Sequence, residues 1–265
     1  MDIFFIIFSA GLGTRLKTPF PKPLSPILNS KIIDFNINSI IKLTTLMKLR
    51  RFVIYINLHK DGDKIYKHVN QKYEWLVKKQ KICFLFEHKP LGHIGTIDKL
   101  KYHILEYNKL VLLNSDIIIP SLEELLKKIC IIDKSSLILY KTNPDKSKSK
   151  TLTHFETLPH PIEPFYKIKT YTKELENRKY INLYTGVSMI KINKKLSVLL
   201  LNENFKQINF LEFINFIITH EELLAIFCSK FYEITNTKDL LIANVNFLKK
   251  LVPVIGLPSI SDIEF

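Results

Sequence analysis

Two glycines and two cationic side chains stand close together near the start of the chain, directly after an apolar run. The run is Ile3–Phe8, which predicts a buried strand, and the turn that follows it contains Gly11 and Gly13. Glycine lets the main chain approach a ligand closely, so the backbone N–H groups of such a turn can bind phosphate oxygens. Arg15 adds a guanidinium suited to bidentate phosphate contact, and Lys22 adds a compact positive charge. This combination predicts a nucleoside-triphosphate site.

Two other phosphate-binding motifs are excluded by the same segment. The dinucleotide-binding pattern G-x-G-x-x-G requires a third glycine where this chain has Leu16. A P-loop requires G-K-[ST] at its end, and no such sequence follows. A plain strand-to-helix connection is disfavoured as well, because the loop through Pro19, Pro21, Pro23 and Pro26 is longer than such a connection needs.

The segment Ala10-Gly-Leu-Gly-Thr-Arg-Leu16, followed by Pro21-Lys-Pro-Leu-Ser-Pro26, resembles the start of the sugar-phosphate nucleotidyltransferases. Their signature is G-x-G-T-R-[LM] followed by P-K-x-L-x-P. The resemblance implies an enzyme that transfers a nucleotidyl group from an NTP to a sugar 1-phosphate, giving an NDP-sugar and pyrophosphate. It implies Arg15 and Lys22 as catalytic residues. The residues it assigns to the nucleotide in this loop are Ala10, Gly11, Leu12, Gly13 and Thr14.

The same resemblance implies a magnesium site and a further nucleotide contact. Asn114-Ser-Asp116 follows an apolar strand and resembles the family's N-x-D pattern, in which the aspartate binds Mg²⁺. A carboxylate at the end of a strand can hold this cation over a triphosphate. The family's second acidic ligand corresponds to Glu233, within Tyr-Glu-Ile, and Asn114 is expected to contact the nucleotide.

Residues for the base and for the sugar follow from weaker segments. Leu91-Gly-His-Ile-Gly-Thr-Ile97 resembles the family segment L-G-T-A-G-A-[LI], which contacts the base through Gly92 and through the residue four positions before the leucine, here Glu87. An ionised glutamate only accepts hydrogen bonds, which suits the N1–H and N2–H₂ donors of guanine and favours GTP. The residues implied for the sugar phosphate are Asn182, Gly186 and Lys173.

Composition limits the other classes of protein. The formal net charge is +14, but the lysines are scattered, so we expect no specific nucleic-acid binding, and the positive field would attract anionic substrates. No apolar run reaches the roughly 20 residues of a membrane span. The three cysteines are far apart and lack C-x-x-C spacing, which favours a cytoplasmic protein without a disulfide framework.

The elements that must hold these residues alternate between strands and helices in the first half. The predicted strands are Ile3–Phe8, Phe52–Leu58, Lys81–Phe86, Leu110–Leu113, Ser136–Tyr140, Tyr166–Tyr171, Thr185–Ile190 and Leu224–Glu233. The predicted helices are Ile32–Leu49, Lys64–Val77, Thr96–Glu106, a helix to Ile131 with a Ser121–Glu124 capping box, Phe210–Thr219 and Thr237–Leu251. This order predicts the α/β class, with a mainly parallel sheet and ligand loops at the carboxyl ends of its strands.

The resemblance refines the fold class and the organisation of the chain. It implies a Rossmann-like mixed sheet flanked by helices, as in nucleotidyltransferases and GT-A folds, with a small sugar-binding β subregion. We expect one domain over residues 1–251, with a nucleotide-binding half (1–140), a sugar-phosphate-binding half (150–251) and a tail (252–265). Two alternatives stay open: a cytidylyltransferase acting on phosphocholine or a similar small phosphate, and a catalytically weak regulatory homologue. A homo-oligomer also stays open.

Overall fold

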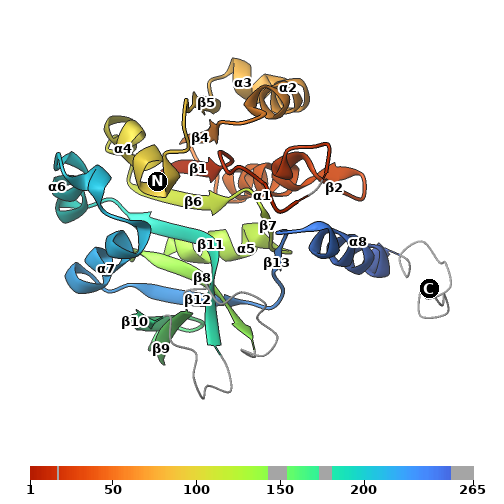
Figure 1. The fold of residues 1–265 in the computed structure, drawn as a ribbon. Coiled ribbons are helices and arrows are strands. Elements are labelled where there is room, and N and C mark those ends of the chain that lie inside the picture. The colour runs from red at the N-terminus through yellow and green to blue at the C-terminus, as the bar shows by residue number, and fades with distance from the viewer. Residues whose placement is uncertain (17, 143–153, 173–180, 252–265) are drawn as a thin grey trace.

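A nine-stranded mixed sheet forms the centre of the molecule (Figure 1). The computed structural model describes residues 1–16, 18–142, 154–172 and 181–251. The strands are β1 (Asp2–Phe8), β2 (Pro26–Ile27), β3 (Ser30–Lys31), β4 (Arg51–Leu58), β5 (Ile82–Phe86), β6 (Lys109–Asn114), β7 (Ile117–Ile118), β8 (Ser136–Thr142), β9 (His154–Pro159), β10 (Tyr166–Thr172), β11 (Ile181–Lys191), β12 (Leu224–Cys228) and β13 (Tyr232–Glu233). The helices are α1 (Ile32–Leu46), α2 (Gly62–Lys72), α3 (Glu74–Lys78), α4 (Gly92–Ile104), α5 (Leu122–Ile131), α6 (Lys194–Leu201), α7 (Phe210–His220) and α8 (Thr237–Leu251), with the 3-10 turns η1 (Lys22–Leu24) and η3 (Phe205–Gln207).

The strand order across the sheet is β5-β4-β1-β6-β11-β8-β12-β10-β9. Four strands from the first half, β5, β4, β1 and β6, are parallel to one another. Strand β11 from the second half enters antiparallel between β6 and β8, and β12 lies parallel to β8. The predicted α/β class, with a mixed and mainly parallel Rossmann-like sheet, is confirmed. Because β1 and β6 are parallel neighbours, the loops after them open at the same edge of the sheet.

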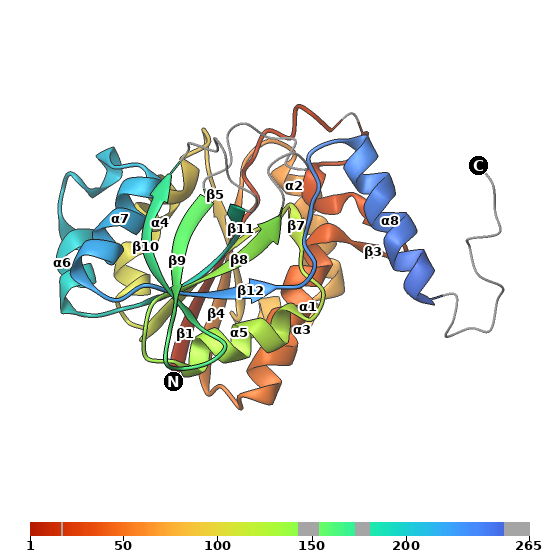
Figure 2. The same cartoon turned by 90° about the horizontal axis from the view of Figure 1, so that it is seen from below.

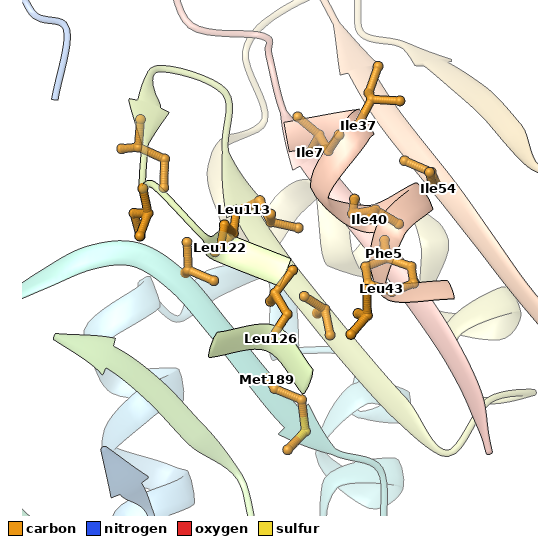
Figure 3. Packing of buried hydrophobic residues seen from close by; sticks show 14 of the residues in the cluster. Phe5, Ile7, Ile37, Ile40, Leu43, Ile54, Leu113, Leu122, Leu126 and Met189 are labelled. Carbon is orange, nitrogen blue, oxygen red and sulfur yellow. The ribbon is translucent and has the colours of Figure 1, made fainter. Parts of the chain in front are cut away.

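Both faces of the sheet are covered by helices, which explains why β1 is a continuous apolar run. Alternate side chains point to opposite faces: Ile3, Phe5 and Ile7 belong to one buried cluster, whereas Phe4 and Ile6 belong to another. Helices α1 and α5 cover the first face, and Figure 3 shows Phe5 and Ile7 beside the α1 side chains of Ile37, Ile40 and Leu43. Helices α4, α6 and α7 cover the second face, as the view from below shows (Figure 2).

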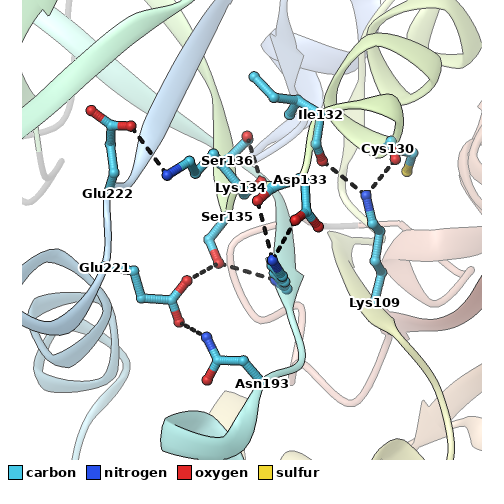
Figure 4. Close-up of polar contacts among 11 residues, drawn as sticks. Lys109, Cys130, Ile132, Asp133, Lys134, Ser135, Ser136, Asn193, Glu221 and Glu222 are labelled. Carbon is cyan, nitrogen blue, oxygen red and sulfur yellow. Dashed lines mark hydrogen bonds and ion pairs between the residues drawn. The ribbon is translucent and has the colours of Figure 1, made fainter.

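The edge of the sheet opposite the β1 and β6 loops carries a polar network (Figure 4). The amine of Lys109, at the start of β6, is buried and donates to the carbonyl oxygens of Cys130 (2.5 Å) and Ile132 (2.9 Å). These carbonyls lie at the end of α5, where helices leave acceptors unpaired. Burial lowers the pKa of Lys109 from its usual value. This lysine therefore stabilises the joint between α5 and the sheet.

Several predicted boundaries differ from the structure for local reasons. The helix expected from Thr96 begins at Gly92, which adopts a left-handed φ of +69°. Thr96 therefore lies inside the first turn, where its hydroxyl donates to the Gly92 carbonyl oxygen. The expected Ser121–Glu124 capping box is wrong: Ser121 itself has φ +58° and its side chain makes no cap. The strand expected over Leu224–Glu233 is two strands, β12 and β13, which pair in different sheets.

Candidate active site

The glycine-rich turn after β1 lines a cavity of about 430 Å³. Gly13 has φ +60°, a conformation that glycine adopts without strain, and Leu16 N–H closes the turn on the Gly13 carbonyl at 3.1 Å. The lining residues come from the ends of β1, β4 and β6 and from the starts of η1 and α4. They are Phe8, Ser9, Ala10, Gly11, Leu12, Gly13, Thr14, Arg15, Lys22, Pro23, Asn57, Pro90, Gly92, His93, Asn114, Ser115, Asp116 and Thr235. Most residues predicted for catalysis and nucleotide binding therefore lie around one cavity.

Lys22 and Asp116 form an ion pair at the wall of this cavity. The Lys22 Nζ lies 2.6 Å from Asp116 Oδ2, and the two side chains are only 14% and 28% exposed. Lys22 begins the 3-10 turn η1, which Pro23 favours as its second residue, whereas Asp116 follows β6. Residues 94 positions apart thus bring a cation and a carboxylate together beside the glycine-rich turn.

Glu233 reaches the same region through a short ribbon. Strands β7 and β13 pair so that Glu233 stands opposite Ile117, and Ile234 N–H donates to the Asp116 carbonyl at 2.9 Å. Burial raises the pKa of Glu233, and the Asp116 carboxylate raises it further. The positive charges of Lys22 and Arg15 act in the opposite direction, so they too lie within electrostatic reach of Glu233. The two acidic residues predicted as metal ligands are therefore neighbours.

This donor set fits Mg²⁺ better than a transition metal. Magnesium usually binds proteins through one or two carboxylates and takes its remaining ligands from water and substrate phosphates. Asp116 and Glu233 supply two carboxylates beside the glycine-rich turn. No group of three or more His, Cys, Asp or Glu side chains with the geometry of a metal site occurs within the described residues. The two carboxylates present fit a cation that takes its remaining ligands from outside the protein.

Glu87, predicted to contact the base, lies one layer behind the cavity. Its Oε1 accepts hydrogen bonds from Asn57 Nδ2 (2.8 Å) and Thr96 Oγ1 (2.7 Å), and its Oε2 accepts from Leu91 N–H (3.0 Å). The residue is 7% exposed and does not line the cavity. Asn57, which does line it, also accepts from Ser9 N–H at 2.6 Å. Glu87 thus fixes the wall through Asn57 and the loop before Gly92.

The residues predicted for the sugar phosphate are not gathered at the cavity. Asn182 donates from Nδ2 to the Phe155 carbonyl at 3.0 Å, a contact that joins β11 to β9. Gly186 adopts φ +81° where β11 breaks register with β8, and it lies against the Asn114 side chain. Lys173 falls outside the described residues. Of the two described positions, Gly186 contacts a residue of the cavity wall, Asn114.

Some wall residues were not predicted from the sequence. Ser9 carries no motif that marks it, and Asn57 belongs to an Asn57-Leu-His59 segment that was not assigned to the site. Their place in the wall depends on β1 and β4 being neighbours in the sheet. Thr235 enters from the segment between β13 and α8. His93 also lines the cavity and was not predicted as a site residue. It stands where the family segment L-G-T-A-G-A-[LI] has threonine, and this difference was the signal in the sequence.

Fold and cavity together define an α/β protein with a glycine-lined cavity at the carboxyl ends of parallel strands. The sequence matches the nucleotidyl transferase family over residues 5–150, which is more than half of the chain. The protein belongs to this family and is a nucleotidyltransferase, which confirms the resemblance inferred from the sequence. A comparison with curated protein sequences gave no match.

Two solved structures share the fold at low sequence identity. HddC from Yersinia pseudotuberculosis, complexed with GMP-PN, is 17% identical with a TM-score of 0.64, covering 93% of this chain and 100% of that one. UDP-glucose pyrophosphorylase, complexed with UDP-glucose, is 14% identical with a TM-score of 0.71, covering 94% of this chain and 100% of that one. Within the described residues, no helix is both long and apolar enough to cross a membrane.

Proposed function

We propose that the protein transfers a nucleotidyl group from an NTP, with GTP favoured, to a sugar 1-phosphate in a Mg²⁺-dependent reaction. The observation that carries this proposal is the convergence of Arg15, Lys22 and Asp116 on the cavity lined by the glycine-rich turn. The acceptor phosphate is mostly dianionic at neutral pH, since its second pKa lies near 6. It needs no general base, so the protein must bring two anions together and stabilise the leaving group.

The glycine-rich turn and the charged residues near it have separate roles in this proposal. The turn from Gly11 to Thr14 and the guanidinium of Arg15 bind the β and γ phosphates, whereas Lys22 bridges the α-phosphate and the acceptor phosphate. An acceptor oxygen attacks the α-phosphorus, the bond from that phosphorus to the bridging oxygen of the β-phosphate breaks, and pyrophosphate leaves with the electron pair. Asp116 and Glu233 would hold the Mg²⁺, which would neutralise charge on the substrate phosphates.

Two observations support GTP. Glu87 is a pure acceptor, and its Oε2 accepts a single hydrogen bond from the described residues, although a carboxylate oxygen can accept two. Since Glu87 lies one layer behind the cavity, a donor of the base would use this second acceptor position only by reaching past Asn57. HddC, which shares the fold, was crystallised with a guanine nucleotide analogue.

The test is pyrophosphate release with Mg²⁺, for four NTPs crossed with a panel of sugar 1-phosphates and phosphocholine. We expect turnover with GTP and a sugar 1-phosphate, and a loss of at least about 100-fold in Arg15→Ala, the scale of removing a transition-state charge contact. Arg50→Ala is the matched control, because Arg50 is exposed and does not line the cavity. Turnover with CTP and phosphocholine would replace the proposal, and unimpaired Arg15→Ala would overturn the site.

A further inference from the structure

One histidine occupies the point at which the nucleotide-binding half meets the second half of the chain. His93 is the second residue of α4 and lines the cavity. Its ring packs edge-on against Phe8, with 4.3 Å between centroids, and lies 5.0 Å from the ring of Phe210 at the start of α7. Burial lowers the pKa of His93, so the ring is neutral at neutral pH.

A hydrogen bond to Asn114 determines which ring nitrogen of His93 carries the hydrogen. His93 Nε2 lies 2.9 Å from Asn114 Oδ1, which can only accept, so Nε2 carries the hydrogen. The same asparagine accepts at its backbone oxygen from Asn36 Nδ2 at 3.3 Å. Asn114 is therefore held at its main chain by α1 and at its side-chain oxygen by α4.

Because His93 holds the Asn114 side-chain oxygen, the direction of Asn114 Nδ2 is fixed as well. Asn114 Nδ2 approaches Gly186 of β11 so closely that a Cβ at Gly186 would lie 2.7 Å from it. Within the described part of the chain this Nδ2 donates no hydrogen bond, and it is not among the fully buried polar atoms that lack a partner. Asn114 lines the cavity, so it carries there a donor without a partner among the described residues, two residues before Asp116.

We propose that His93 is a positioning residue that holds the Asn114 amide so that its Nδ2 donates to a hydroxyl of the acceptor. This inference rests on the proposed function and narrows it: the acceptor is a polyhydroxylated phosphate, because a trimethylammonium head offers no hydrogen-bond acceptor. Without the His93 donor the amide can rotate by half a turn and present its oxygen in place of its nitrogen. In this proposal Asn114 contacts the acceptor, whereas the sequence assigned it to the nucleotide.

The test separates binding of the two substrates in His93→Phe, which keeps an aromatic ring beside Phe8 but cannot donate. We expect KM for the sugar 1-phosphate to rise about fivefold to tenfold, the change that corresponds to one neutral hydrogen bond. KM for the NTP and its Kd by calorimetry stay within about twofold, a margin well below one hydrogen bond. His93→Gln, which can donate, restores the acceptor KM, and His103→Phe, on the exposed face of α4, is the matched control.

The outcomes distinguish this inference from the proposed function. If the wild type makes NDP-sugar but His93→Phe leaves the acceptor KM unchanged, or raises both KM values equally, the positioning role is wrong and the function stands. If the wild type uses no sugar 1-phosphate, the proposed function fails and this inference fails with it. A folded His93→Phe that still binds NTP, judged by melting temperature and calorimetry, keeps the comparison valid.

Discussion

Asp34 joins α1 to α2 through a buried carboxylate, and its removal is expected to destabilise the protein strongly. The side chain is 1% exposed. Its oxygens lie 2.9 Å from His68 Nε2, 2.7 Å from Lys72 Nζ and 3.1 Å from the Tyr73 hydroxyl, and it accepts from Lys31 N–H at 3.0 Å. Asparagine can accept at only one of its two terminal atoms, so Asp34→Asn leaves part of this set unpaired.

The pKa of Asp34 gives the magnitude. Burial raises this pKa, but the hydrogen bonds from His68, Lys72 and Lys31 outweigh burial and lower it from 3.8 to about 2. A shift of this size corresponds to about 2 kcal/mol of folding free energy at neutral pH. Since the folded pKa is the lower one, this contribution is fully present above the unfolded value of 3.8 and is lost as the pH falls through about 2. Roughly half of it is lost by about pH 3.

The assay is urea unfolding of wild type and Asp34→Asn between about pH 3 and 8. We expect a difference in unfolding free energy of about 2–4 kcal/mol at pH 7, because breaking a buried ionic set costs more than the linkage term alone. The difference shrinks below pH 4. Glu74→Gln is the matched control: its ion pair with Lys78 is exposed at both ends and is worth less than about 0.5 kcal/mol. A difference below about 1 kcal/mol, or one that is constant with pH, would refute this reasoning.

Three further changes probe the cavity wall. Lys22→Met removes the ammonium 2.6 Å from Asp116, so calorimetry should show tighter Mg²⁺ binding without nucleotide while turnover falls at least about 100-fold; unchanged Mg²⁺ affinity would contradict competition at Asp116. Glu87→Gln should lower kcat/KM for GTP relative to UTP by about tenfold if the carboxylate accepts from the base; an equal loss for every NTP would assign Glu87 to the wall alone. Gly186→Ala should lower the free energy of unfolding in urea by about 1–2 kcal/mol, because its φ of +81° is strained for alanine. It should also raise the acceptor KM, because the added methyl group displaces Asn114. Unaltered kinetics would show that this displacement does not reach the substrate.

Local patterns predicted the elements whose burial is uniform along their length. Strand β1 has both faces covered, so every position from Ile3 to Ile7 is apolar and the run is unambiguous. Helix α8 was predicted at its observed bounds, Thr237–Leu251, and in the structure Asp239 accepts from Thr235 N–H at its first turn. Strand β9 and helix α6 were not predicted, and both lie in the second half, where the family resemblance is weak.

Site residues that lie in one continuous segment could be placed together from the sequence. Site residues that strand pairing brings together could not. Arg15 and Lys22 stand seven residues apart in a recognisable motif, so their shared cavity followed from sequence. Glu233 was found by a motif, but its proximity to Asp116 depends on the pairing of two strands of two residues each, which carry too little sequence to predict. The tertiary placement of such ribbons has no local signal.

Glu87 shows why residue identity alone leaves a role open. A glutamate that only accepts is suited to guanine, but it is equally suited to the amide of Asn57 and the hydroxyl of Thr96, and the structure satisfies those two donors first. Both partners lie on other elements, β4 and α4, so their approach depends on the packing of a helix on a sheet. The same holds for His93, whose proton is fixed by an asparagine 21 residues away. Hydrogen-bond capacity can be read from the sequence, whereas its distribution between protein and substrate is set by the fold.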